Sequence, residues 1–79
     1  MSRVRIYRPR RIRDLVKRRD ALSRLTSTAA VMVAQQARGA AQATIEETGW
    51  MCLEAGRTCQ RVGCSRDEIE QAIARGGLE

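Results

Sequence analysis

Apolar and polar residues follow two different periods along this chain, and each period predicts a different kind of element. From Ser2 to Arg8, apolar and basic residues alternate with a period of two, which predicts a strand-like segment that ends at Pro9. A lone strand is not stable by itself. The segment is therefore expected either to lie extended along a partner or a groove, or to form a disordered arm.

The next stretch, Arg10 to Leu25, has helical periodicity. Pro9 suits the first turn of a helix, because its missing N–H would have no partner there. One face is apolar and contains Ile12, Leu15, Val16, Leu22 and Leu25. The other face carries Arg11, Lys17, Arg18 and Arg24, and it is either a solvated face or a ridge that binds phosphates.

A second, alanine-rich helix is predicted from about Thr28 onward. Thr26, Ser27 and Thr28 are good N-cap residues, and alanine favours the helix strongly enough that Gly39 is expected inside it. One face consists mainly of small residues: Ala30, Ala34, Ala37, Ala41 and Ile45. We expect this face to pack on the first helix; alternatively, it joins two copies of the chain in a homodimer.

The stretch from Glu46 to Gly49 leaves two alternatives open. Either the helix breaks near Thr48 and Gly49 and a separate helix covers Trp50 to Val62, or a single helix of about 35 residues runs through. A glycine that follows two glutamates and a threonine favours the break. Trp50 and Met51 are then large apolar side chains that either fill a small core or anchor a partner.

The strongest local signals lie between Thr58 and Ala74. Ser65 and Glu68 have the spacing of a capping box, in which each side chain accepts a hydrogen bond from the other residue's backbone amide. Gly63 lies where the preceding helix has to end, because glycine adopts the left-handed conformation of a C-cap without steric cost. A helix, a tight turn and a second helix are therefore predicted, and Gly76 and Gly77 end the last helix.

This segment resembles the helix-turn-helix of Cro-type phage repressors. The matching positions are a small residue in the first helix, the turn glycine with an apolar residue after it, a branched residue in the second helix and its closing pair: Cys59, Gly63, Cys64, Ile69, Ala72 and Ile73. The resemblance implies that the second helix contacts DNA.

The second helix also departs from that family's pattern. It offers Asp67, Glu68 and Glu70 where the family usually has base-reading polar or basic side chains, and carboxylates are repelled by phosphates. The alternative interpretation is therefore a capped helical hairpin that closes the core.

Charge is distributed unevenly over the 79 residues. Ten basic and two acidic residues from Met1 to Arg24 give a net charge of +8, whereas five basic and seven acidic residues from Leu25 onward give −2. Basic segments of this kind commonly bind phosphate or an acidic protein surface. Nearly all of the cations are arginine, which forms bidentate contacts with both kinds of anion, although a GC-rich genome would produce the same bias.

Candidate chemistry is sparse. The three cysteines, Cys52, Cys59 and Cys64, form no C-x-x-C pair, and the chain contains no histidine, so we expect no metal site, no disulfide framework and no cofactor. A cysteine nucleophile would lack a conventional base, and we expect a non-enzyme. No apolar run approaches the length of a membrane span, so a cytoplasmic protein without membrane contact is expected.

These observations predict an all-α fold with a small bundle of three to four helices. Residues 1–9 would form a basic extended arm and residues 10–79 a single helical domain with a helix-turn-helix-like C-terminal hairpin. With only 79 residues and no phenylalanine, the core is expected to be thin, and a partner or a second copy is a reasonable expectation.

Two function classes fit this architecture. The first is a nucleic-acid-binding regulatory protein whose arm and first helix contact phosphates, and whose helix-turn-helix-like C-terminal part also contributes to binding. The second is an inhibitor or adaptor encoded by a phage or mobile element, which binds an acidic or nucleic-acid-binding host protein through the same basic surface. Anti-CRISPR proteins are one such group, although no motif assigns the chain to them. The candidate contact residues are Arg3, Arg5, Arg8, Arg10, Arg11, Arg13, Lys17, Arg18, Arg57, Arg61, Ser65, Arg66 and Gln71.

Overall fold

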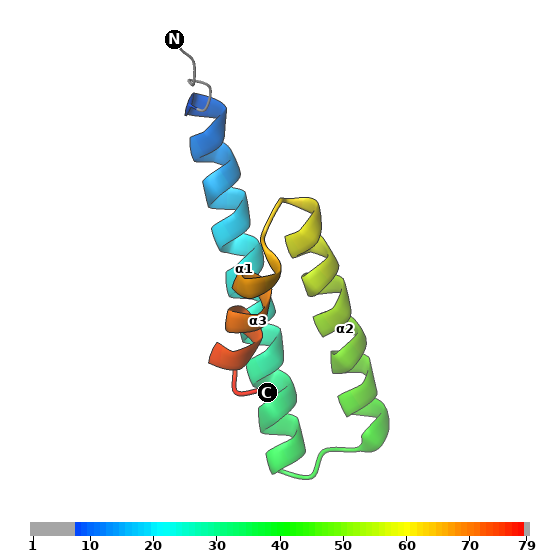
Figure 1. The fold of residues 1–79 in the computed structure, drawn as a ribbon. Helices are drawn as coiled ribbons and strands as arrows, with labels where there is room; N and C mark the ends of the chain where they lie inside the picture. The colour runs from blue at the N-terminus through cyan, green and yellow to red at the C-terminus, as the bar shows by residue number, and fades with distance from the viewer. Residues whose placement is uncertain (1–7, 79) are drawn as a thin grey trace.

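Helices and short turns make up the described part of the chain in a computed structural model (Figure 1). The structure describes residues 8–78, and it describes side chains from residue 12 onward. The helices are α1 (Arg8–Ala37), α2 (Gln42–Arg61) and α3 (Arg66–Arg75). The all-α fold class is thus confirmed. The predicted arm lies outside the described residues, except that Arg8 and Pro9 already belong to α1.

The helices run up and down beside one another. α2 returns antiparallel to α1, and α3 turns back and lies against the middle of α1 (Figure 1). α3 packs mainly on α1 and only slightly on α2. α1 has 30 residues and is therefore about 45 Å long, so its N-terminal turns extend past both other helices (Figure 1).

The α1–α2 and α2–α3 turns have the same hydrogen-bond pattern. The amide of Ala40 donates to the carbonyl of Gln35 at 2.9 Å, and the amide of Cys64 donates to the carbonyl of Cys59, also at 2.9 Å. In both turns a glycine precedes the donor, Gly39 with φ 70° and Gly63 with φ 91°. These are Schellman caps, which need a left-handed residue at that point. The cap predicted at Gly63 is confirmed.

Small side chains dominate the core. The fully buried positions include Leu25 and Ala29 of α1, Cys59 of α2 and Ala72 of α3. Partly buried branched residues, among them Val62, Ile69 and Ile73, pack around this cluster. Cys59 of α2 and Ala72 of α3 lie in the same cluster, but much of the packing is provided by α1.

The predicted break at Thr26–Thr28 is wrong, because α1 is continuous through it. The threonine hydroxyls are used in other ways than capping. Thr26 Oγ1 donates to the carbonyl of Ala72 in α3 at 2.8 Å, and Thr28 Oγ1 donates to the carbonyl of Arg24 one turn earlier, also at 2.8 Å. Thr26 thus fastens α3 to α1 instead of starting a helix.

The expected positions of the next helix boundaries are also wrong. Gly39 ends α1 instead of lying inside a helix, and Thr48 and Gly49 lie within the unbroken α2. Both alternatives, the break near Gly49 and the single helix of about 35 residues, are therefore excluded. Thr48 is buried, and its hydroxyl donates to the carbonyl of Thr44, which keeps this polar group satisfied within the helix.

Two packing expectations change as well. Of the small-residue face, only Ile45 is partly buried, and the four alanines are exposed, so this face does not pack on another helix of the same chain. Trp50 and Met51 are 65% and 58% exposed, which excludes the interpretation that they fill the core. The alanine face and the side chains of Trp50 and Met51 thus point outward. The homodimer predicted through the alanine face stays a prediction.

Candidate functional site

The basic N-terminal half of α1 is the most distinctive surface of the molecule. Between Ile12 and Arg24 the helix carries five basic and two acidic side chains. Arg13, Lys17, Arg19 and Arg24 are exposed. The first turns of α1 extend past α2 and α3 (Figure 1), whereas Lys17 and Arg24 lie farther along the helix, beside α2. Because all four side chains are exposed, an approaching anion can reach them without a rearrangement of the core.

Arg18 differs from its neighbours because it contacts the turn between α2 and α3. Its Nε donates to the carbonyl of Val62 at 3.3 Å, and its guanidinium lies over Gly63. A cation at the C-terminal end of α2 is stabilised by the helix dipole. The thiol of Cys64 in turn lies 3.9 Å from the carbonyl oxygen of Arg18. Arg18 therefore fastens the hairpin to α1, in addition to any contact with an anion.

The candidate residues of the C-terminal hairpin already have partners within the chain. Ser65 Oγ accepts from the amide of Glu68 at 3.1 Å, and the Glu68 carboxylate accepts from the amide of Ser65 at 2.7 Å, which confirms the predicted capping box. Arg66 pairs with Glu70 at 3.1 Å, and Arg57 pairs with Glu54 at 3.3 Å.

Two further hairpin candidates, Arg61 and Gln71, are exposed. Arg61 donates to the hydroxyl of Thr58 at 3.0 Å, one turn earlier in α2. Gln71 is exposed on α3. The two side chains thus belong to different helices, Arg61 to the end of α2 and Gln71 to α3.

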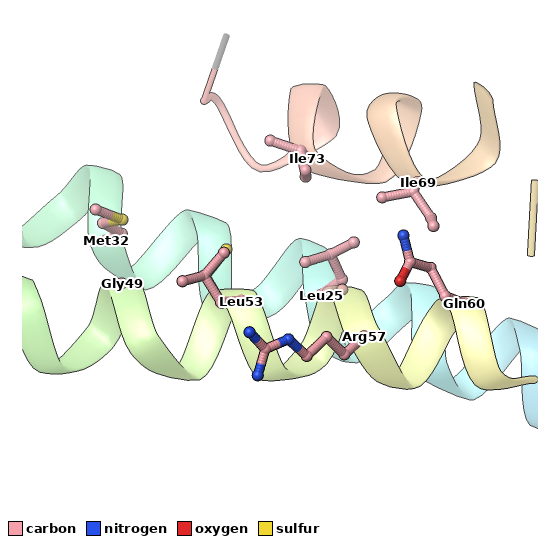
Figure 2. Close-up of a pocket in the computed structure, with 10 residues that line it drawn as sticks. Leu25, Met32, Gly49, Leu53, Arg57, Gln60, Ile69 and Ile73 are labelled. Atoms are coloured by element: carbon pink, nitrogen blue, oxygen red, sulfur yellow. The ribbon is translucent and has the colours of Figure 1, made fainter. Parts of the chain in front are cut away.

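A groove opens where α2 and α3 diverge over α1. It has a volume of about 520 Å³, with Leu25 at its base and Leu53, Ile69 and Ile73 along its sides (Figure 2). Arg57 and Gln60 of α2 lie at its edge. The α2–α3 hairpin is open in this region because α2 and α3 pack only slightly on each other.

A second hollowed surface lies between α1 and α2. Its α1 side carries Lys17 and Arg24, and its α2 side carries Trp50, Met51 and Thr58. The basic face predicted for the first helix includes Arg24 together with Lys17, but the candidate contact residues do not include Arg24. Arg24 lies seven residues after Lys17, a spacing that places both on one face of a helix.

The cysteines are core residues. Cys59 is fully buried and Cys64 is nearly so, and all three thiols are free. Burial raises the pKa of Cys59 to about 11 and also raises the pKa values of Cys64 and Cys52. A thiol with a raised pKa is protonated near neutral pH and is a poor nucleophile.

Neither a cluster of metal ligands nor a membrane-spanning helix is present in the described part of the chain. No group of three or more His, Cys, Asp and Glu residues between residues 8 and 78 could hold a metal ion. Across the same residues, no helix is both long enough and apolar enough to cross a bilayer.

The remaining candidates lie toward the N-terminus. Arg3 and Arg5 are outside the described residues. Arg8, Arg10 and Arg11 belong to the first turns of α1, and the structure does not describe their side chains.

Comparison with known proteins yields no relative. No protein-family model matches the chain, and no curated protein or solved structure is significantly similar to it.

Proposed function

We propose that the protein is a small, non-enzymatic, nucleic-acid-binding regulatory protein that contacts phosphates through α1. The observation that carries this proposal is the set of exposed cations on a helix that extends past the rest of the bundle (Figure 1). Arginine and lysine side chains on an uncovered helix can follow a phosphate backbone, because each phosphate they neutralise releases a counterion. Arg3, Arg5, Arg8, Arg10 and Arg11 are further candidates for phosphate contacts from the sequence alone.

The helix-turn-helix contribution is the second part of the proposal. For α3 to read bases, Arg66 would have to leave Glu70, whereas Gln71 is exposed as it stands. Ser65 could contribute only while its hydroxyl also caps α3. Because Arg66 and Ser65 already have partners within the chain, the affinity should come mainly from α1. Any sequence preference should come from Gln71.

A titration of labelled duplex DNA, single-stranded DNA and RNA, followed by fluorescence anisotropy across a salt series, tests this proposal. Arg13→Gln and Lys17→Gln should weaken binding to all sequences alike and reduce the salt slope by about one each. Arg38→Gln is the matched control, because Arg38 is exposed in the turn at the opposite end of α1. Gln71→Ala should change sequence preference if α3 reads bases.

Equal affinity of the α1 variants and the Arg38 control would contradict phosphate binding by α1. Absence of binding near physiological salt would favour the second candidate function, an inhibitor or adaptor that binds an acidic host protein. One observation supports that candidate: Ile12, Leu15 and Val16 are 68%, 59% and 44% exposed on the same part of α1. Exposed apolar side chains beside arginines suit a protein surface better than a phosphate backbone.

A further inference from the structure

The groove between α1 and α2 combines cations and an aromatic ring in one continuous surface. Two adjoining hollows form it, and they share Arg24, Ala55 and Thr58. Lys17 lies in the hollow nearer the N-terminus of α1, and Trp50 with Met51 lies in the other. Trp50 and Thr58 are eight residues apart on α2, so this side of the groove is about 12 Å long between them.

Trp50 is the only tryptophan of the chain, and its side chain is 65% exposed. The core does not use it, although the core otherwise consists of small residues and has few large apolar groups. An indole ring at the edge of a hollow can stack on a planar ring. Stacking of a nucleobase on an aromatic side chain contributes about 1–3 kcal/mol per base.

The charges along the groove favour an anion. Two carboxylates lie there, Asp20 and Glu54, and each has a basic neighbour: Arg19 lies 3.9 Å from Asp20, and Arg57 lies 3.3 Å from Glu54. Lys17 and Arg24 take part in none of the ion pairs within the described part of the chain. Lys17 and Arg24 are therefore the cations of the groove that remain available to an anion.

We propose that this groove binds single-stranded nucleic acid. Trp50 stacks on a base, and Lys17 and Arg24 contact the adjoining phosphates. The inference rests on the proposed function and specifies its ligand. A duplex keeps its bases stacked inside, so it can offer phosphates to α1 but no exposed base face to Trp50. A single strand offers both at once, which matches cations on the α1 side and an aromatic ring on the α2 side.

Labelled single-stranded DNA, single-stranded RNA and duplex DNA are titrated with the parent protein and with Trp50→Ala, Trp50→Phe and Leu53→Ala. Trp50→Ala should weaken binding to single strands by about 5-fold to 100-fold and leave duplex binding unchanged. Trp50→Phe should retain most of the affinity. Leu53→Ala is the control, because Leu53 is 55% exposed on the same helix but lines the other groove.

Intrinsic fluorescence supplies the independent readout, since emission from the single tryptophan should be quenched by single strands and not by duplex. The DNA and RNA arms show which of the two single strands is preferred. Tight binding of single strands without quenching, and with equal affinity in Trp50→Ala, would overturn this inference while the proposed function stands. Binding to duplex alone, weakened by Arg13→Gln as expected, would likewise overturn this inference while the proposed function stands. Absence of binding to every nucleic acid would overturn both.

Discussion

Gly76, which follows the last residue of α3, lies in close contact with α1. A Cβ atom on this residue would lie 2.7 Å from Ala29 Cβ and 2.7 Å from the carbonyl oxygen of Thr26, both in α1. Neither neighbour is the end of a flexible side chain, so the end of α3 would have to move. The backbone of Gly76 is in the ordinary helical region, at φ −78°, and the restriction is therefore purely steric.

We expect Gly76→Ala to lower the free energy of unfolding by about 1–3 kcal/mol, because α3 is displaced from α1. Gly56→Ala is the control with the same chemical change. A Cβ on Gly56 would meet nothing within 4 Å, and the residue lies inside α2, so this variant should gain up to about 1 kcal/mol. Urea unfolding followed by circular dichroism measures both. A Gly76→Ala protein as stable as the parent would show that α3 does not lie this close to α1.

At the scale of single elements, α3 is the shortest helix and depends most on its ends. It has 10 residues, fewer than an isolated helix needs for stability in water. Its N-terminus has the capping box, and Asp67 and Glu68 lie in its first turn, where the helix dipole favours negative charge. The carboxylates that argue against base reading thus have a structural role.

Ser65→Ala should therefore cost about 1 kcal/mol of stability, because the amide of Glu68 loses its side-chain acceptor. Ser27→Ala provides the comparison, since Ser27 is exposed in the middle of α1 and alanine is favoured there. Thermal unfolding of the two variants beside the parent measures the difference. Equal midpoints for Ser65→Ala and the parent would mean that the capping box does not stabilise α3.

The elements that could be predicted from sequence are those set by neighbouring residues. The caps at Gly63 and Ser65 depend on local geometry alone, and both are present. The boundaries that failed depend on distant parts of the chain. Thr26 looks like an N-cap until Ala72 of α3 accepts its hydroxyl hydrogen bond. Nothing in the sequence indicates that Gly39, instead of Gly49, ends a helix.

The candidate surface could be predicted in part for the same reason. Charge patterning identified the basic face of α1. Periodicity identified an apolar face as well, but it could not show that α2 and α3 are too short to cover Ile12 and Val16. The groove containing Trp50 joins residues of two helices, so no local pattern could have predicted it.

For the whole molecule, the core contains an ionisable residue at a central position. Cys59 is fully buried within the cluster that contains residues of all three helices of the described chain. Its neighbour Cys64 follows the turn glycine, and the two thiols lie in the same core. Burial raises the pKa of Cys59 from its usual value of 9.0 to about 11. The stability of the whole domain is therefore linked to alkaline pH.

We expect stability to be independent of this thiol below pH 9 and to fall as the pH rises to about 11. In that interval the unfolded chain releases the Cys59 proton before the folded chain does, so the unfolded state binds fewer protons and is favoured. Urea unfolding at a series of pH values measures the effect. Cys59→Ala should reduce the loss of stability between pH 9 and about 11. A smaller dependence of stability on pH should remain because of Cys64. An identical pH profile in parent and variant would contradict the burial of an un-ionised thiol.

α1 is one continuous helix, but its turns before Lys17 can unfold separately from the turns around Leu25 and Ala29. The turns around Leu25 and Ala29 open only when the core opens, because α2 and α3 pack on them. The turns before Lys17 are held mainly by their own backbone hydrogen bonds, so they can fray and re-form while the core stays intact. Amide protons along α1 should therefore exchange with solvent in a gradient, fastest near the N-terminus. A ligand that holds the cationic turns before Lys17 would slow exchange there and leave the rates of the core turns unchanged. The part of the binding surface that extends past the bundle is thus less stable than the part beside α2.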